Sequence, residues 1–229
     1  MKSAVIVFPG SNRERDVADA IERTTGTRPH MVWHKESDLP KVDLIVLPGG
    51  FAYGDYLRCG AIAAHSNVIR EVKRRAEQGT AVLGICNGFQ VLIEAGLLPG
   101  ALLRNRSLRF VCKEVGLEVD NADSAFTHRY QRGQRVVFLA AHGDGNYFVD
   151  DDGRRELEDQ ERIVFRYCDA KGQVTPEANP NGSVANIAGI TNRAGNVLGL
   201  MPHPENLVEP ALGGTDGRAM FEGLAEALS

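Results

Sequence analysis

The chain has 229 residues, of which 43% are hydrophobic and 24% are charged, with a formal net charge of −4 at pH 7. This composition is typical of a globular protein with a sizeable core. The slightly acidic balance gives no electrostatic reason to expect nucleic acid or an anionic membrane as a partner, and we expect neither. No stretch approaches the roughly 20 apolar residues of a membrane span, and the N-terminus does not resemble a signal peptide.

The spacing of the cysteines indicates their redox state and argues against a metal site. The four cysteines lie far apart in the sequence, with no C-x-x-C pair and no metal-ligand spacing: Cys59, Cys86, Cys112 and Cys168. We therefore expect reduced thiols, a cytoplasmic location, and neither a metal nor a cofactor bound to this chain.

The first half of the chain alternates short apolar runs with helical patterns. Strands are predicted at residues 3–8, 30–34, 43–47 and 81–85, and helices at 13–24, 61–78 and 89–95. In the second helix, Ile62, His65 and Ile69 recur at helical spacing, which predicts that His65 lies on the apolar face. Gly79 is predicted to end that helix.

The second half is more mixed. Strands are predicted at residues 135–140, 162–168, 187–191 and 197–201, the last two joined by a hairpin at NRAGN. A final helix is predicted at 216–228, capped by Thr215. The acidic segment 150–161 is predicted to be a solvated loop.

Together these elements predict an α/β fold: an open, mostly parallel sheet with helices on both faces, and mixed strands in the C-terminal half. Without repeats or a linker, residues 1–229 are expected to form a single domain. Ligands of such sheets gather beyond the carboxyl ends of the strands. Three predicted strands are followed there by PGGFAYGD, CNGF and MPHPE.

Cys86 is the candidate nucleophile. The sequence GICNG fits the elbow pattern G-x-nucleophile-x-G between a strand and a helix, where glycines relieve crowding around a strained residue. The start of the following helix favours a thiolate. The alternative is a buried cysteine that only fills core space.

A thiolate needs a base, and the base needs an orienting group. In MPHPE, prolines flank His203, so we predict an extended segment from which His203 and Glu205 project to the same side. The alternative is an ordinary loop histidine beside a solvated glutamate.

Backbone donors for an oxyanion form the third component of the predicted site. The paired glycines of PGGF let backbone N–H groups turn toward a ligand, and the N–H of Asn87 follows the nucleophile. A simple turn is the alternative for the glycine pair.

Taken together, PGGF, GICNGFQ and MPHPE resemble the class I (triad) glutamine amidotransferases over nearly the whole chain. Within that family the chain is most similar to the glutaminase subunits of phosphoribosylformylglycinamidine synthase. FPGSN at 8–12, GGFAYGDYLRCGAIAA at 49–64, NRSLRFVCK at 105–113 and AHGDGNYF at 141–148 carry this narrower similarity.

The resemblance implies roles for individual residues. Cys86 would be the nucleophile, His203 the general base and acid, and Glu205 the group that orients His203. Backbone near the oxyanion would come from Gly50, with Phe51 close by, and from Asn87. Residues implied to bind or line the pocket for L-glutamine are Gln90, Asn105, His142 and Gly143. For His142, a turn residue is the equal alternative.

Two positions depart from the pattern of the family. Arg13 stands where a cysteine is expected after Ser-Asn, and Asp144 stands where a glutamate is usual. Neither residue belongs to the implied triad. The two departures therefore affect the expected contacts with substrate or partner, but not the expected reaction.

The resemblance also implies partners. The chain lacks a phosphate-binding G-x-x-x-x-G-K-[ST] sequence. A large synthetase subunit would use ATP with magnesium to activate formylglycinamide ribonucleotide and would receive the ammonia, assisted by a small accessory subunit. We expect GFAYGDYLRCG, with Tyr53, Tyr56 and Arg58, to contact that partner or else only to cover the pocket. The remaining cysteines, including Cys59, are interpreted as structural.

Two other functions remain open at this point. A cysteine hydrolase of the α/β-hydrolase type would place its acid before the histidine, whereas Glu205 follows His203. A non-catalytic regulatory protein on the same scaffold would not need both residues. Labelling by a glutamine-derived diazoketone would separate these cases, because only an amidotransferase is modified at Cys86 in competition with glutamine.

Overall fold

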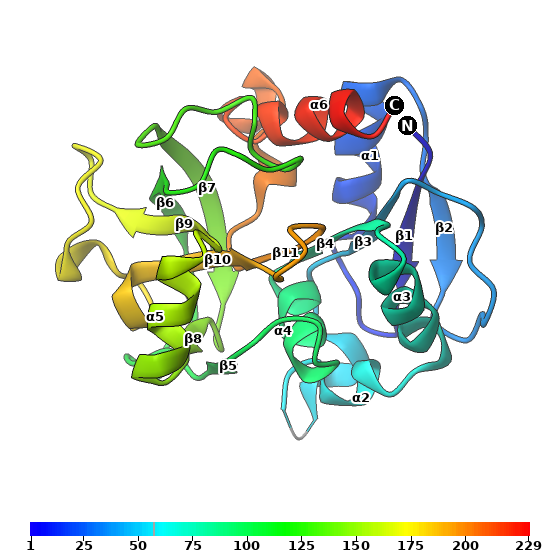
Figure 1. The fold of residues 1–229 in the computed structure, drawn as a ribbon, viewed down its shortest axis with the longest axis horizontal. Coiled ribbons are helices and arrows are strands. Elements are labelled where there is room, and N and C mark those ends of the chain that lie inside the picture. The colour runs from blue at the N-terminus through cyan, green and yellow to red at the C-terminus, as the bar shows by residue number, and fades with distance from the viewer. Residues whose placement is uncertain (57) are drawn as a thin grey trace.

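A nine-stranded sheet runs through the computed structural model, which describes residues 1–56 and 58–229 (Figure 1). Its strand order is β2-β1-β3-β4-β11-β10-β9-β6-β7, and β5 and β8 form a separate antiparallel pair. The strands are β1 (Ser3–Val7), β2 (His30–Trp33), β3 (Leu44–Leu47), β4 (Ala81–Ile85), β5 (Ala101–Leu103), β6 (Val111–Val119), β7 (Arg135–His142), β8 (Asn146–Phe148), β9 (Ile163–Cys168), β10 (Ile187–Thr191) and β11 (Val197–Leu200).

Helices cover the sheet and short 3-10 turns follow several strands. The α-helices are α1 (Glu14–Thr25), α2 (Ala61–Ala64), α3 (Asn67–Glu77), α4 (Asn87–Glu94), α5 (Asp151–Asp159) and α6 (Arg218–Ala227). The 3-10 turns are η1 (Ala52–Asp55), η2 (Pro176–Ala178), η3 (Val184–Asn186), η4 (Pro204–Asn206) and η5 (Pro210–Leu212). None of the helices in the described part of the chain has the length and apolar character that a bilayer crossing needs.

The strands β2, β1, β3, β4 and β11 are parallel neighbours and form one half of the sheet. Strands β1, β3 and β4 are buried almost throughout, because α1 and α6 pack together on one face and α3 and α4 cover the other (Figure 1). The register pairs Leu47 with Gly84 and Leu200 with Ile85. The segments that follow β3, β4 and β11 therefore emerge side by side.

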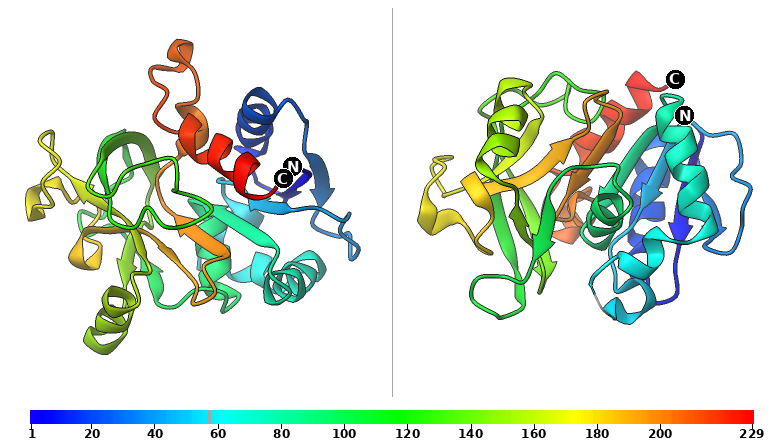
Figure 2. Two further views of the ribbon diagram at one scale, coloured as in Figure 1. Left: turned by 45° about the horizontal axis from the view of Figure 1, so that its top comes forward. Right: turned by 60° about the horizontal axis from the view of Figure 1, so that its bottom comes forward.

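The other half of the sheet is antiparallel and turns back toward the first. Strands β10, β9, β6 and β7 follow β11 in antiparallel pairs. The last strand, β7, forms an isolated bridge between Leu139 and His203, just beyond β11. Figure 2 shows the two halves beside each other and the two termini close together, with the loop that contains η2 projecting from the body.

The predicted fold class is confirmed, and the strands predicted at residues 3–8, 30–34, 43–47 and 81–85 correspond to β1 to β4. In the second half, β7, β9, β10 and β11 lie where strands are predicted, and NRAGN joins β10 to β11 as an antiparallel hairpin. Gly79 ends α3 in a left-handed conformation, with φ of 94°.

The prediction of one helix over residues 61–78 is wrong. The helix divides into α2 and α3, because Ser66 is extended (φ −67°, ψ 156°) and starts a new helix. His65 falls at this break and is exposed, so it does not lie on the buried face.

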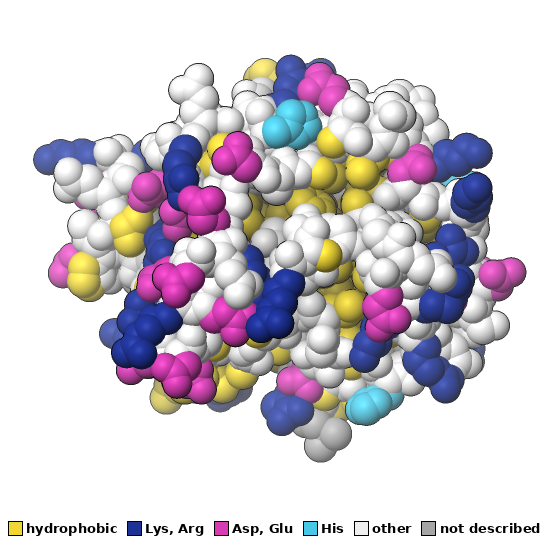
Figure 3. Space-filling view, in the orientation of Figure 1, with side chains coloured by type: hydrophobic (Ala, Val, Ile, Leu, Met, Phe, Trp, Pro, Cys, Tyr) yellow, Lys and Arg dark blue, Asp and Glu magenta, His cyan; other side chains and the backbone are white. Residues whose placement is uncertain are grey.

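Other boundaries also need correction. The acidic segment is not a loop but contains α5, whose N-cap Asp150 accepts a hydrogen bond from the N–H of Gly153 at 2.8 Å. Acidic and basic side chains alternate over α5 on the face shown in Figure 3. Helix α6 begins after Gly217, so Thr215 is not its N-cap. The longest strand, β6, is absent from the sequence prediction because its outer half is polar and exposed.

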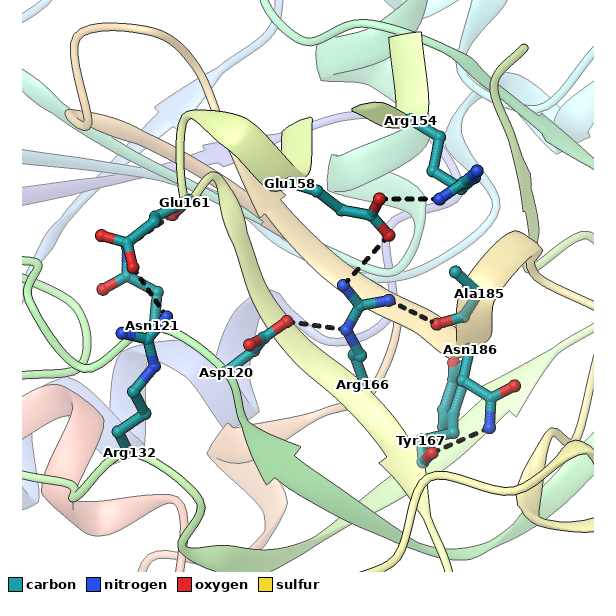
Figure 4. Close-up of polar contacts among 10 residues, drawn as sticks. All are labelled: Asp120, Asn121, Arg132, Arg154, Glu158, Glu161, Arg166, Tyr167, Ala185 and Asn186. Carbon is teal, nitrogen blue, oxygen red and sulfur yellow. Dashed lines mark hydrogen bonds and ion pairs between the residues drawn. The ribbon is translucent and has the colours of Figure 1, made fainter. Parts of the chain in front are cut away.

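Arg166 joins α5 to the antiparallel half of the sheet (Figure 4). Its Nε donates to Asp120 at 2.7 Å and its Nη1 donates to the carbonyl of Ala185 at 2.8 Å. Its Nη2 lies 3.6 Å from Glu158 on α5, which also accepts from Arg154 at 2.6 Å. The Arg166 side chain is only 18% exposed, so these contacts are partly shielded from water.

Replacing Arg166 should therefore destabilise the fold. For Arg166→Ala we expect the free energy of unfolding to fall by about 2 kcal/mol, because its hydrogen bonds are lost and the carboxylate of Asp120 is left without its partner. Arg155→Ala is the matched control, since Arg155 makes only an exposed pair with Asp152 on the same helix as Glu158. Urea denaturation measures both; equal midpoints for the two variants would contradict this role of Arg166.

Candidate active site

Cys86 occupies the turn between β4 and α4 in a conformation that few residues adopt. Its φ of 51° and ψ of −106° lie outside the regions that non-glycine residues favour. Its N–H donates to the carbonyl of Leu200 at 2.8 Å, which fixes the turn to the neighbouring β11. Its Sγ lies 3.6 Å from the carbonyl oxygen of Ala141. This strained strand-to-helix turn has the geometry of a nucleophile elbow.

The two glycines around Cys86 are required by close packing. A Cβ atom at Gly84 would lie 2.4 Å from Leu92 Cδ1, and one at Gly88 would lie 1.9 Å from the carbonyl oxygen of Leu47. Helix α4 therefore reaches the end of β3 only because position 88 has no side chain.

His203 follows β11, the strand beside β4, and its ring is held from one side. His203 Nδ1 lies 2.7 Å from Oε1 of Glu205, and both side chains are buried. The N–H of His203 donates to the carbonyl of Leu139 at 2.7 Å. The predicted extended segment is partly wrong: His203 is extended, but Pro204 starts the turn η4 that carries Glu205. Pro204 fits there because its fixed φ suits the first position of a helical turn.

Gly49 brings these elements together. A Cβ atom on Gly49 would lie 2.7 Å from Cε1 of His203 and 3.5 Å from Cβ of Cys86. The glycine after β3, the cysteine after β4 and the histidine after β11 thus share one small volume. The structure brings Cys86, His203 and Glu205 together as the sequence predicts.

The charges around His203 favour its protonated form. Burial by itself would lower the pKa of His203, but the charges of Glu205 and Cys86 and hydrogen bonds to both outweigh it and raise the pKa to about 10. The ring of His203 is therefore an imidazolium beside the sulfur of Cys86.

Two backbone N–H groups near Cys86 are free to bind an anion. Among the described residues, neither Gly50 nor Asn87 donates its N–H to another protein atom. The N–H of Phe51, by contrast, donates to the carbonyl of Gly10 at 2.9 Å. Phe51 is therefore excluded as a backbone donor, although its half-exposed ring lines the cleft described next.

A cleft of about 640 Å³ opens beside Cys86, and we call it the Cys86 cleft. Six of the predicted residues line it: Cys86, Gly50, Phe51, Gln90, His142 and Gly143. The lining residues that were not singled out include Asp55, Arg104, Leu108, Arg109 and Phe110. His203, Glu205, Asn87 and Asn105 are not among its lining residues.

Asn87 and Gln90 organise one wall of the cleft. Asn87 Oδ1 accepts from the N–H of Ala52 at 3.0 Å, and Nδ2 donates to Asp55 at 3.1 Å and to Gln90 Oε1 at 2.8 Å. Gln90 Nε2 donates to the carbonyl of Asp144 across the cleft at 2.8 Å. The amide of Gln90 is thereby held in one orientation.

Asn105 is buried behind the cleft and does not line it, which corrects the expected pocket position. Its Nδ2 donates to the carbonyls of His142 at 2.8 Å and Arg109 at 2.9 Å, and its Oδ1 accepts from the N–H of Gly145 at 3.0 Å. Asn105 therefore shapes the turn that follows β7.

His142 is a neutral, buried histidine that lies beside Asn181. Burial lowers the pKa of His142 to about 4, and the charge of His203 adds to this. Asn181 Nδ2 lies 3.1 Å from Nε2 of His142 and donates to the carbonyl of Gly145 at 2.8 Å, while Nδ1 of His142 has no protein partner among the described residues. Sequence reasoning missed Asn181; its only signal is the turn sequence NPNG.

The turn η1 presents Asp55 to the cleft. Tyr53, Gly54 and Asp55 have successive positive φ values of 55°, 76° and 53°, which is a rare conformation outside glycine. Burial raises the pKa of Asp55, and the charge of Asp144 adds to this. Burial also raises the pKa of the Cys59 thiol, with Asp55 and Asp144 adding to it, so Cys59 is a poor nucleophile although it lines the cleft.

The segment predicted to contact a partner has mixed exposure. Tyr53 packs inward, with its hydroxyl bonded to His34, whereas Tyr56 is 74% exposed. The Arg58 side chain is 75% exposed and pairs with Glu94 at 2.7 Å. Leu57, in the same segment, lies outside the described residues.

Comparison with known proteins agrees with this site. Residues 1–213 match the family described as CobB/CobQ-like glutamine amidotransferase domain. The chain is 54% identical to the phosphoribosylformylglycinamidine synthase subunit PurQ of Bartonella henselae, an alignment that covers 99% of this chain and 98% of that protein. It is 56% identical to the PurQ subunit of Rhodospirillum rubrum, with 100% of both chains covered.

A solved structure supports the same grouping. The fold matches a chain of the PurLQS structure from Thermotoga maritima with a TM-score of 0.88 and 43% sequence identity, covering 100% of this chain and 99% of that one. The chain therefore belongs to the PurQ family, the glutamine amidotransferase subunits of phosphoribosylformylglycinamidine synthase.

Proposed function

We propose that Cys86 is the nucleophile that releases ammonia from L-glutamine, with His203 as acid and base and Glu205 as its orienting group. The observation that carries this proposal is the strained cysteine beside a buried histidine–glutamate pair, next to two free backbone N–H groups. Such a constellation suits acyl transfer from an amide.

The reaction follows from these positions. The thiolate of Cys86 attacks the side-chain carboxamide of glutamine, and the N–H groups of Gly50 and Asn87 bind the oxyanion. Each well-aimed donor stabilises the transition state by about 3 kcal/mol. His203 gives its proton to the leaving nitrogen, so ammonia departs and a γ-glutamyl thioester remains. Water then loses a proton to His203 and attacks the thioester, which frees glutamate and the thiol.

The walls of the Cys86 cleft suit a small zwitterion. His142 and Gln90 line this cleft, and Gln90 supports the wall on which the glutamine would lie. Gly143 lines the cleft next to His142. Asn105 acts indirectly, by holding the carbonyl of His142 in place.

The ammonia is used elsewhere. We propose that this chain passes it in the cytoplasm to a large synthetase subunit, assisted by a small accessory subunit. That synthetase binds ATP with magnesium and converts formylglycinamide ribonucleotide into formylglycinamidine ribonucleotide. Support comes from the relatives, which are named as subunits of that synthase, and from the solved PurLQS structure.

The mouth of the Cys86 cleft is the surface that we propose for docking of the synthetase. Large apolar side chains are exposed there: Phe51 at 47%, Leu108 at 75% and Phe110 at 54%. Arg58, Arg104 and Arg109 line the same cleft, and arginine with aromatic residues is enriched at interface cores. A synthetase seated on this mouth would receive ammonia without exposing it to bulk water.

The identity of the nucleophile can be tested directly. Cys86→Ala should abolish glutamine hydrolysis because no other group can form the thioester, while ammonia-dependent synthesis by the assembled complex should persist. Cys112→Ala is the control, since Cys112 is exposed on β6. Glutamate release and labelling by a glutamine-derived diazoketone are the measurements. Hydrolysis at the wild-type rate by Cys86→Ala would refute the assignment.

The role of Glu205 predicts a pH effect. Glu205→Gln removes a charge that raises the pKa of His203, so the basic limb of the kcat profile should move to lower pH. We expect kcat near neutral pH to fall by about 10²–10⁴-fold. Glu222→Gln, on the surface of α6, is the control.

The pH dependence of folding stability should also reflect the raised pKa of His203. The raised pKa of His203 stabilises the native state fully below pH 6.5, and this contribution is lost as the pH rises toward about 10. In Glu205→Gln this contribution should be smaller and its loss should be complete at lower pH, as measured by urea denaturation across that range. An unshifted rate profile together with an unchanged pH dependence of stability would contradict the role of Glu205.

The docking surface is tested at Arg58, which lines the mouth of the cleft, and at the nearby exposed residue Tyr56. Tyr56→Ala combined with Arg58→Ala should weaken association with the synthetase about tenfold or more, because such side chains dominate interface energies. Trp33→Ala is the control, since Trp33 is 42% exposed on β2, the edge strand farthest from β7 in the strand order. Titration calorimetry with the synthetase subunit measures the affinity. Loss of affinity only in the Trp33 variant would contradict the proposed surface and indicate an interface at β2.

A further inference from the structure

A second cavity, separate from the Cys86 cleft, reaches the triad through Glu205. It has a volume of about 310 Å³ and shares none of its lining residues with the Cys86 cleft. Helix α1, strand β7 and the segment after β11 form its walls. Glu205 is 1% exposed and is the triad member that lines it. We call it the Glu205 cavity.

One oxygen of Glu205 lacks a partner. Oε1 is bonded to His203, but Oε2 is buried and makes no hydrogen bond within the described part of the protein. A buried carboxylate oxygen left unpaired costs free energy, so a donor is expected to reach it at some stage of the cycle.

Arg13 is the cation best placed to do so. It lines the Glu205 cavity, and its Cγ lies 3.3 Å from the position of a Cβ on Gly49, the same position that is 2.7 Å from His203 Cε1. Arg13 therefore lies directly behind the triad, because the end of β1 emerges at the same sheet edge as the ends of β3 and β4.

The guanidinium of Arg13 is only loosely held in this structure. Its Nη1 pairs with Asp16 at 2.9 Å, and the two side chains are 37% and 41% exposed. Pairs this exposed contribute little to stability. The hydrogen bond to Asp16 raises the pKa of Arg13, and the charges of Glu205 and Cys86 add to this, which places the guanidinium in the electrostatic field of the triad.

We propose that Arg13 is a positioning residue that tunes the triad by sharing its guanidinium between Asp16 and the free oxygen of Glu205. This inference rests on the proposed function. When the guanidinium turns from Asp16 to Glu205, it offsets part of the carboxylate charge that stabilises the imidazolium of His203. His203 then becomes a stronger acid toward the departing ammonia.

Other charged groups around Glu205 are already occupied or lie across the triad. Arg23, also on α1, is bonded to Glu209, and Asp19 lies 4.0 Å from Arg28. His203 and Cys86 face Glu205 from the active-site side, with the neutral His142 beyond them. Of the described cations that line the Glu205 cavity, Arg13 and Arg23, only Arg13 can move without breaking a link between α1 and another segment.

The test compares two variants that should act in opposite directions. Arg13→Gln removes the positive charge, so the basic limb of the kcat profile for glutamine hydrolysis should rise by about one pH unit. Asp16→Asn releases Arg13 toward Glu205, so the limb should fall. Arg13→Lys should restore most of the wild-type profile, and Arg15→Gln, an exposed neighbour on α1, should leave it unchanged. The chain is assayed in complex with its synthetase.

Opposite shifts support the proposal, because a merely structural role would lower the rate without moving the pH profile in both directions. Superimposable profiles, or shifts of the same sign, overturn it. If Arg13→Gln does not fold, as judged by urea denaturation, the sign of the Asp16→Asn shift decides. Failure of the proposed function would look different, because the wild-type complex would then release no glutamate from glutamine at any pH.

Discussion

The close approach of α4 to the end of β3, where Gly88 lies against the carbonyl of Leu47, determines where the sulfur of Cys86 lies. Cys86 is the N-cap of that helix, and Asn87 is its first residue. The same helix start therefore positions Cys86 and the free N–H of Asn87, and through the side chain of Asn87 it also holds η1 and Gln90. A methyl group at position 88 would displace all of these together.

The two halves of the sheet contribute different parts of the site. The parallel half provides the segments after β3, β4 and β11, which carry Gly50, Cys86 and His203. The antiparallel half provides His142 and the turn that follows it, secured by Asn105 and Asn181. Catalytic geometry thus rests on the parallel strands, whereas the opposite wall of the cleft rests on hydrogen-bonded loops of the antiparallel strands.

Much of this arrangement could be predicted because the relevant signals are local. Buried strands such as β3 and β4 are continuous apolar runs, and the glycines around Cys86 mark a sharp turn in one short segment. Polar or interrupted segments were harder to predict from the sequence. Strand β6 was missed because its residues 112–114 are exposed, and the break at Ser66 was missed because the apolar spacing continues across it.

Contacts between distant segments could not be predicted from apolar runs or from turn residues. The N–H of Phe51 is occupied by Gly10, and the amide of Asn105 is occupied by backbone groups of the turn after β7, so neither follows from its own neighbours in the sequence. Asn181 acts on His142 across 39 positions of the chain. Such pairings depend on how the antiparallel half closes, which a single sequence does not reveal.

The bridge between Leu139 and His203 has a mechanical consequence. Strand β7 is the last of the sheet, yet its backbone is hydrogen-bonded to His203, so a displacement of that strand would move the imidazole relative to the sulfur of Cys86. The outermost strand of the sheet therefore takes part in holding His203 beside Cys86.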